Sequence, residues 1–224
     1  MNKPANFSNI HKYYDLINTI TTLGFDKSWR SQAAKNLNPG SVLDLGSGTG
    51  ASYEDLNSFD VTALDPDEQM LSLNKFDRKI VGRGEDLPFN ENSFDNVICC
   101  FVWRNISETE KVINEVYRVL KPGGKFILLD MTRPKNSILR ILHKIGTFIL
   151  LHFIGLITMN FKEYRFLHKS LDFYPQPEIH LAKNEYLSLD IKRTGFFDFV
   201  YIACLLYTSP SPRDLLKSRM PSSA

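Results

Sequence analysis

Short apolar runs alternate with amphipathic helical patterns along most of the chain. Four runs have the length and composition of buried strands, and they occupy residues 41–45, 61–64, 96–101 and 125–129. Helical patterns between them cover residues 67–75 and 107–120. This order predicts an α/β fold with a mostly parallel central sheet, helices on both faces and ligands at the carboxyl ends of the strands.

The second helical pattern carries its own start and stop signals. Ser107 and Glu110 have the spacing of a capping box, which predicts a helix beginning at this point. Residues 121–124 read KPGG, and proline followed by glycines predicts a turn into the next strand. Only about 14 residues, 146–159, form the longest apolar stretch, against roughly 20 in a spanning helix, so we predict no transmembrane helix.

Composition narrows the protein class. The chain has 224 residues, of which 43% are hydrophobic and 23% charged, and this excludes a disordered or collagen-like chain. A formal net charge of +2 is by itself too small to indicate binding to nucleic acid or to a membrane surface. The three cysteines have no disulfide or metal-site spacing, and the polar start of the chain lacks a signal segment, so we expect a cytoplasmic protein without a bound metal.

The end of the chain differs from the rest. Residues 204–224 read CLLYTSPSPRDLLKSRMPSSA, with several prolines and no amphipathic period. Parts of this segment resemble the translated read-through of a transposase sequencing adapter. We therefore predict that residues 1–203 form one domain and that 204–224 are not native. A genuine polar tail is the alternative.

The first chemical motif is a glycine-rich turn after the first predicted strand. Residues 44–50 read DLGSGTG, and glycines at such a turn let a ligand approach the backbone. The glycine spacing also fits a dinucleotide fingerprint. Asp44 argues against a dinucleotide, because its carboxylate would repel a pyrophosphate. The same carboxylate suits S-adenosylmethionine, which carries an amino group and a sulfonium.

Two further motifs follow at the same predicted sheet edge. Asp65 ends a strand, so its carboxylate can accept hydrogen bonds from ribose hydroxyls; a helix N-cap is the alternative role. Residues 82–89 (GRGEDLPF) form an acidic loop that can present a backbone amide and a side chain to an adenine edge. A solvated acidic turn is the alternative reading of that loop.

The motifs in sequence carry a family resemblance. DLGSGTG, ALDPDEQML, GEDLPF, NSFDNVI and YRVLKPGGKFILLD follow one another as in class I S-adenosylmethionine-dependent methyltransferases, which have a Rossmann-like fold. Residues 14–18, Trp29-Arg30 and Trp103-Arg104-Asn105-Ile106 make the chain similar to the ubiquinone/menaquinone C-methyltransferase family. The resemblance implies transfer of a methyl group to carbon of a demethylmenaquinol or related polyprenyl quinol.

The resemblance also implies which residues hold S-adenosylmethionine. Arg83 and Cys100 stand where the family commonly has other residue types, and the short stretch between Gly50 and Asp65 suggests a trimmed first crossover helix. The expected cofactor-binding residues are Asp44, Gly46, Gly48, Thr49, Gly50, Asp65, Arg83, Gly84 and Cys100.

Three residues are candidates for the chemistry. Arg104 follows a strand and can stabilise the oxyanion of a deprotonated ring hydroxyl; a surface ion pair is its alternative role. Asp130 and Tyr14 are candidates for proton removal, although Asp130 can equally cap a turn. None of the histidines has a setting that marks it as a base.

Partners and the chain end complete the expectations. Residues 137–175 are expected to form a helical lid, in which 137–159 packs on the domain, lines a channel for an isoprenoid tail or rests on a bilayer. Self-association into a homodimer is left open. The resemblance places a sixth strand near 197–202 and a seventh beyond 203, so we expect a truncated C-terminal hairpin, unless residues 204–208 fill the open edge.

Other functions remain open at this stage. A methyltransferase for another small molecule would differ only in its acceptor. A nicotinamide-dependent dehydrogenase would bind NADH rather than S-adenosylhomocysteine. A non-enzymatic relative would bind the cofactor without methyl transfer.

Overall fold

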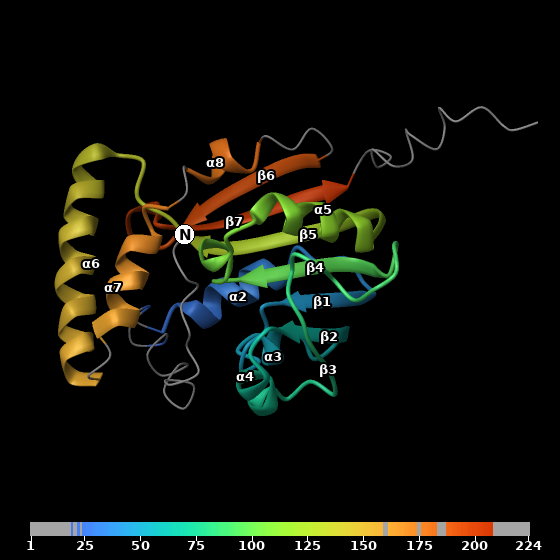
Figure 1. Ribbon diagram of the computed structural model, residues 1–224. Helices are drawn as coiled ribbons and strands as arrows, with labels where there is room; N and C mark the ends of the chain where they lie inside the picture. The colour runs from blue at the N-terminus through green and yellow to red at the C-terminus, as the bar shows by residue number, and fades with distance from the viewer. Residues whose placement is uncertain are drawn as a thin grey trace, which may run out of the picture.

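The computed structural model describes residues 19, 22, 24–158, 161–173, 176–182 and 187–207. Within them, seven strands form one sheet in the order β3-β2-β1-β4-β5-β7-β6 (Figure 1). The strands are β1 (Ser41–Leu45), β2 (Asp60–Asp65), β3 (Arg78–Val81), β4 (Phe94–Cys100), β5 (Leu120–Met131), β6 (Leu187–Thr194) and β7 (Val200–Tyr207). Neighbours among β1 to β5 pair in parallel, whereas β7 runs antiparallel to both β5 and β6. The predicted α/β fold with a mostly parallel sheet is confirmed.

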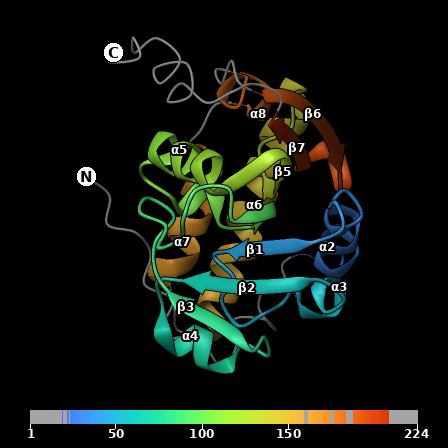
Figure 2. The ribbon, with the colours of Figure 1, turned by 90° about the vertical axis from the view of Figure 1, so that its right-hand side faces the viewer.

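Helices cover both faces of the sheet (Figure 2). Successive strand residues point to opposite faces, so Val97 and Cys99 contact one core whereas Ile98 and Cys100 contact the other. Helix α5 (Thr109–Val119) packs into the first core, and α2 (Asp26–Ala34), α3 (Tyr53–Leu56) and α4 (Glu68–Leu73) pack into the second. The shorter elements are η1 (Trp103–Asn105), α8 (Pro177–His180) and η2 (Phe196–Asp198).

Of two local predictions, the capping box at the start of α5 is not present, whereas the turn at 121–124 is. The capping box is wrong, because Glu108 is the N-cap of α5 and makes no side-chain cap hydrogen bond. The predicted turn at 121–124 is present as an irregularity within β5. Phe94 pairs with Leu120 and Asn96 pairs with Lys125, so these four residues loop out of the register. The expected trimming of the first crossover is confirmed, since α3 has only four residues.

The predicted truncation of the C-terminal hairpin is wrong. The hairpin consists of β6 and β7, and β7 lies between β5 and β6 with Ala203 opposite Leu128. The segment predicted as the sixth strand is therefore the start of the seventh. Residues 204–207 continue β7, and Leu205 is fully buried, so this part of the segment predicted to be foreign closes the edge of β5.

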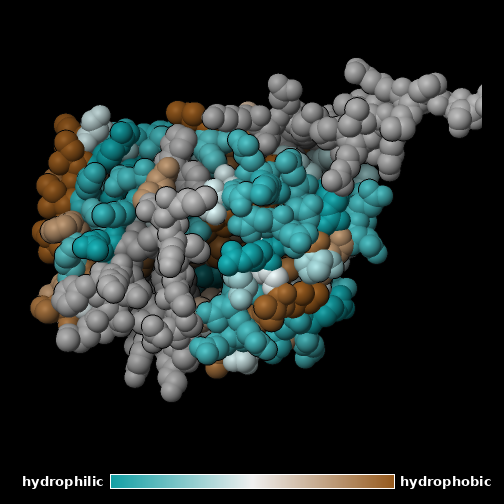
Figure 3. Space-filling view, viewed as in Figure 1, coloured by the Kyte–Doolittle hydropathy of each residue, from teal (hydrophilic) through white to brown (hydrophobic). Residues whose placement is uncertain are grey.

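A helical hairpin stands at the end of the sheet towards which the parallel strands run (Figure 1). It consists of α6 (Ser137–Thr158) and α7 (Phe161–Ser170), which pack against each other. Apolar atoms gather along α6 on the surface (Figure 3). The exposed residues of this α6 apolar face are Ile138, Ile141, Leu142, Ile145, Phe148, Ile149, Leu150, Phe153 and Leu156.

The apolar part of α6 is longer than the sequence pattern indicated. By length and composition alone, Ser137–Leu156 is sufficient to cross a membrane, with a hydropathy of 1.5, and little of it is buried in the protein. The estimate of about 14 apolar residues was therefore too short, because it ended the segment at the charged residues Arg140 and Lys144 rather than including them.

Candidate active site

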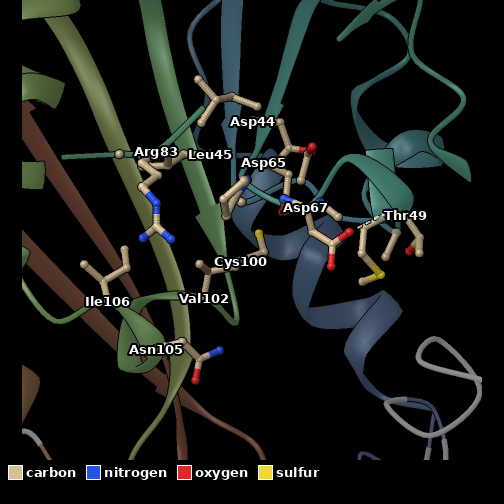
Figure 4. Close-up of a pocket in the computed structure, with 18 of the residues that line it drawn as sticks. Asp44, Leu45, Thr49, Asp65, Asp67, Arg83, Cys100, Val102, Asn105 and Ile106 are labelled. Atoms are coloured by element: carbon tan, nitrogen blue, oxygen red, sulfur yellow. Dashed lines mark hydrogen bonds between the residues drawn. The ribbon is translucent and has the colours of Figure 1, made fainter. Parts of the chain in front are cut away.

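A cavity of about 610 Å³ lies at the carboxyl ends of β1, β2 and β4 (Figure 4). This is the sheet edge at which open α/β folds bind ligands. Of the predicted cofactor residues, Asp44, Gly46, Gly48, Thr49, Asp65, Arg83, Gly84 and Cys100 line it. Gly50 does not line it; its backbone nitrogen donates to the Ser47 carbonyl and shapes the turn from behind.

The glycine-rich turn is held open by its backbone geometry. Gly46 has φ +72° and donates its backbone N–H to the Leu64 carbonyl at 2.8 Å. A Cβ atom at Gly46 would lie 2.7 Å from the Val102 side chain, so glycine is required here. Gly48 also has a positive φ, of +51°. The turn therefore brings its backbone close to the cavity without side chains in the way.

Asp65 braces the same turn. Its Oδ2 accepts the Gly48 backbone N–H at 2.9 Å, and its Oδ1 accepts the Asp67 backbone N–H at 2.9 Å. Burial raises the pKa of Asp65, and these two hydrogen bonds oppose that rise. The N-cap of α4 is Asp67, whose carboxylate accepts from Gln69 and Met70, so the alternative cap role does not fall on Asp65. Each Asp65 oxygen retains a second acceptor site for a ribose hydroxyl.

Asp44 is the most deeply buried carboxyl group of the cavity. It is 2% exposed, and its Oδ2 has no hydrogen-bond partner among the described residues. Burial raises the pKa of Asp44 to about 7; the Arg30 guanidinium lowers it, and the charge of Asp65 raises it further. A buried acceptor of this kind calls for a donor from a ligand. The ammonium group of an amino-acid moiety supplies one.

The acidic loop after β3 is anchored to α5, although Asp86 within it is exposed to solvent. Arg118 of α5 donates Nη1 to the Phe89 carbonyl at 2.6 Å and Nη2 to the Leu87 carbonyl at 2.8 Å. Glu115 accepts the Leu87 backbone N–H at 2.9 Å. These contacts fix the loop, and its first residues Arg83 and Gly84 form one side of the cavity.

Cys100 contributes packing rather than charge. It ends β4 and is buried, and burial raises the pKa of its thiol to about 12. The thiol therefore stays protonated at neutral pH and offers the cavity a small, uncharged wall. A serine at this position would add a hydroxyl donor, so the cysteine makes the wall more apolar.

The structure brings two of the three predicted catalytic residues together. Arg104 and Asp130 form a buried ion pair, and Asp130 Oδ2 also accepts the Arg104 backbone N–H at 3.0 Å. Asp130 Oδ1 accepts the Met131 N–H at 2.7 Å as well. With both oxygens engaged, Asp130 is suited to holding Arg104, and its role as a base stays a prediction. Tyr14 lies outside the described residues.

Arg104 does not line the large cavity. Its neighbours Val102 and Asn105 do, while Arg104 itself lines a small adjacent cavity of about 20 Å³ together with Tyr201 and Ser170. The 3-10 element η1 thus separates the cofactor cavity from the space next to Arg104. Lining residues that were not predicted include Arg30, Ser47, Asp67, Met70 and Ile106.

Comparison with known proteins identifies the family. The profile of the ubiE/COQ5 methyltransferase family matches residues 4–185, most of the chain. The chain belongs to the ubiE/COQ5 methyltransferase family. It is 33% identical over 217 residues to the ubiquinone/menaquinone biosynthesis C-methyltransferase UbiE of Rickettsia bellii, covering 87% of this chain and 84% of that protein. It is 34% identical over 190 residues to the demethylmenaquinone methyltransferase of Thermus thermophilus, covering 77% and 86%.

Solved structures agree on the fold of this ubiE/COQ5 family member. A putative S-adenosyl-L-methionine-dependent methyltransferase of Methanococcus maripaludis matches with a TM-score of 0.64 and 18% identity, covering 95% of this chain and 99% of the other. A methyltransferase of Thermotoga maritima, described as a possible histamine N-methyltransferase, matches with a TM-score of 0.67 and 18% identity, covering 90% and 98%. The predicted methyltransferase and its cofactor, S-adenosylmethionine, are confirmed, and the dehydrogenase alternative is excluded.

The cavity of this family member fits S-adenosylmethionine. Orphaned polar atoms are present where the amino-acid end requires them, at Asp44 Oδ2 and Ser47 Oγ. The carboxylate of Asp65 lies beside the glycine turn for the ribose, and Arg83 lies on another side of the cavity for adenine (Figure 4). Gly84, next to Arg83 in the sequence, also lines the cavity. These individual assignments remain predictions about the residues.

Proposed function

We propose that this enzyme methylates a ring carbon of a demethylated menaquinol or a related polyprenyl quinol. Its location would be cytoplasmic, at the inner face of the membrane. Two relatives support this acceptor: one is described as a ubiquinone/menaquinone biosynthesis C-methyltransferase and the other as a demethylmenaquinone methyltransferase. The observation that carries it is the α6 apolar face, which stands at the same end of the sheet as the cofactor cavity, as a lipid-soluble substrate requires (Figure 3).

In this reaction the protein contributes mainly by positioning the two reactants and by stabilising charge. S-adenosylmethionine supplies a methyl group bound to a positively charged sulfur. The quinol ring carbon bonds to this methyl carbon while the sulfur–methyl bond breaks and its electron pair stays on sulfur. The ring carbon then releases its proton to solvent or a carboxylate, and the ring becomes aromatic again. Holding the two reactants in line supplies much of the acceleration.

We assign to Arg104 the stabilisation of the ring oxyanion. Deprotonation of a ring hydroxyl strengthens the neighbouring carbon as a nucleophile, and a nearby cation favours that deprotonation. Asp130 fixes the guanidinium from one side, while the Nε of Arg104 is buried without a partner among the described residues. We assign this unpartnered N–H as the donor to an oxygen of the substrate.

Transfer of a labelled methyl group tests the acceptor. The purified enzyme is incubated with S-adenosylmethionine labelled in its methyl group and a short-chain demethylmenaquinol; the methylated menaquinol of the same chain length is the control. Label should enter the demethylated quinol and not the control. Binding of S-adenosylhomocysteine without any label in the quinol would refute the quinol assignment, and a panel of other small acceptors would then identify the substrate class.

We further propose that the α6 apolar face rests on the lipid surface rather than spanning the membrane. Helix α7 packs along the other side of α6, where Leu167 contacts Leu151 and Ile154. Arg165 and Lys169 of α7 are exposed, so α7 is unsuited to a hydrocarbon environment. A helix that is apolar on one side and packed on protein on the other lies in the interface plane.

Cations at the start of α6 suit an anionic lipid surface. Lys135, Arg140 and Lys144 are exposed there, and each cation near such a surface adds about 1 kcal/mol of attraction. Lys135 is also 3.0 Å from Glu178 and Lys144 is 3.5 Å from Asp172; both are surface ion pairs that contribute little. The charge and the apolar face together favour a membrane that contains acidic phospholipids.

Co-sedimentation with vesicles tests this surface. Vesicles of phosphatidylethanolamine and phosphatidylglycerol should carry down the wild-type enzyme. The double variant Ile145→Glu/Ile149→Glu should lose most of this binding, whereas Leu73→Glu, an exposed apolar position on α4, should retain it. Circular dichroism checks that α6 persists. Equal binding by all three proteins, or a wild-type homodimer that the double variant dissociates in solution, would contradict the membrane proposal.

A further inference from the structure

Arg30 is a buried cation in the wall of the cofactor cavity. It lies on α2, is 8% exposed and lines the cavity together with Asp44 and Cys100. Its Nη1 donates to the Ser52 hydroxyl at 2.9 Å, and its Nε is buried without a hydrogen-bond partner among the described residues. Buried arginines almost always pair with an anion, and Arg30 makes no ion pair among the described residues.

The packing of Trp29 orients the Arg30 side chain towards the cofactor cavity. Its neighbour Trp29 is buried in the core and contacts the rings of Phe101 and Phe199. Because adjacent helical residues point about 100° apart, anchoring Trp29 turns the next side chain to the cavity. The Arg30 guanidinium then lies 5.0 Å from the centre of the Phe101 ring, a cation–π contact that holds it without neutralising it.

Asp44 interacts with the charge of Arg30 but forms no ion pair with it among the described residues. No hydrogen bond or ion pair between Arg30 and Asp44 is present among the described residues, and Asp44 Oδ2 is itself without a partner. Burial holds the pKa of Asp44 at about 7 even with Arg30 nearby, so this carboxyl group carries only part of a charge at neutral pH. The cavity wall therefore has an unpartnered donor, Arg30 Nε, and an unpartnered acceptor, Asp44 Oδ2, among the described residues.

We infer that Arg30 binds the α-carboxylate of S-adenosylmethionine while Asp44 binds its α-ammonium group. An amino acid is the ligand that carries a cation and an anion on one carbon atom, and a donor and an acceptor in one wall match it. The planar guanidinium suits a carboxylate because it can offer two parallel N–H donors. This inference rests on the cofactor of the family and does not depend on the quinol acceptor.

Three ligands that differ only at the amino-acid end test the inference. S-adenosylhomocysteine has both charged groups, its decarboxylated analogue keeps the ammonium group alone, and 5′-methylthioadenosine has neither. Calorimetry should find that Arg30→Met weakens S-adenosylhomocysteine about 30-fold, as expected for a charge-assisted hydrogen bond. The other two ligands should bind the variant and the wild type within about twofold of each other, since neither offers a carboxylate.

Controls separate contact from a structural role. Arg30→Lys should recover part of the lost affinity, and Arg78→Met removes an exposed arginine of β3 and should change none of the three affinities. Equal weakening of all three ligands by Arg30→Met would overturn the inference, as would unchanged binding of S-adenosylhomocysteine. If Arg30→Met fails to fold, the wild type decides: equal affinity for S-adenosylhomocysteine and its decarboxylated analogue would overturn it. No quinol enters these measurements, so their failure is distinct from that of the proposed acceptor.

Discussion

Binding of the cofactor product should release a proton from Asp44. In the free enzyme, burial raises the pKa of Asp44 to about 7. An ammonium group beside the carboxylate favours its charged form, so the pKa of Asp44 falls towards the usual carboxyl range in the complex. A group whose pKa falls on binding gives up its proton at pH values between its bound pKa and its free pKa. Affinity is therefore full above pH 7 and decreases as the pH falls below that value.

The size of the effect follows from the free pKa. Below about pH 7 each further pH unit should weaken binding of S-adenosylhomocysteine about tenfold, or about 1.4 kcal/mol. Between about pH 8 and about pH 6 the Kd should thus rise about tenfold, and above pH 8 it should stay level. Asp44→Asn removes the titrating group, so it should bind more weakly at pH 8 and lose this pH dependence.

Calorimetry in two buffers with different ionisation enthalpies measures the released proton. At about pH 6 the wild type should release about one proton per bound S-adenosylhomocysteine, and Asp44→Asn close to none. Asp60→Asn, an exposed carboxyl at the start of β2, is the matched control and should behave as the wild type. A Kd that stays level from pH 8 to pH 6, with no proton released by the wild type, would refute this account of Asp44.

Three further outcomes are expected. Arg104→Met should lower turnover about 100-fold or more, and it should also lower Tm because it leaves Asp130 as a buried unpaired charge. Adding Asp130→Asn should restore Tm but not turnover. Recovery of both Tm and turnover in the double variant would show that Arg104 has no part in the chemistry. Gly46→Ala should weaken S-adenosylhomocysteine binding. Gly123 has a similar φ of +79° but no neighbour within 4 Å of the position that a Cβ atom would take, so Gly123→Ala should affect only Tm. Equal effects of the two substitutions on binding would contradict the role of the glycine-rich turn. A chain ending at residue 203 should lose several degrees of Tm relative to one ending at 207, since it lacks the buried Leu205; an equal Tm would show that this part of β7 adds nothing.

Local patterns predicted four of the five parallel strands, all except β3, and most of the cavity. The runs at β1, β2 and β4 are continuous apolar segments that end in chemistry-bearing residues, and parallel strands bring their carboxyl ends to one edge. For that reason Asp44 and Asp65 could be placed together from sequence alone. The charge argument at Asp44 used only one residue and a ligand of known charge, so it needed no tertiary information.

Features that depend on contacts between distant parts of the chain could not be predicted from the sequence. The partner of β5 is β7, and no local pattern distinguishes a strand that inserts between two others from one that lies at the edge. Residues 197–202 were therefore predicted as the sixth strand, although they contain the start of the seventh. Arg30 was noted only as part of a family motif, because its route to the cavity depends on how Trp29 packs against Phe101. The Arg104–Asp130 pair joins residues from different elements and has no signature in spacing.

The position of β7 in the sheet constrains how the polypeptide matures on the ribosome. β6 is synthesised first but has no place to dock until β7 emerges and pairs with β5. Until then, the nascent chain displays a bare row of backbone donors and acceptors along β5, the kind of template that recruits neighbouring strands. Chaperone dependence should therefore be concentrated in the interval before this last strand leaves the exit tunnel.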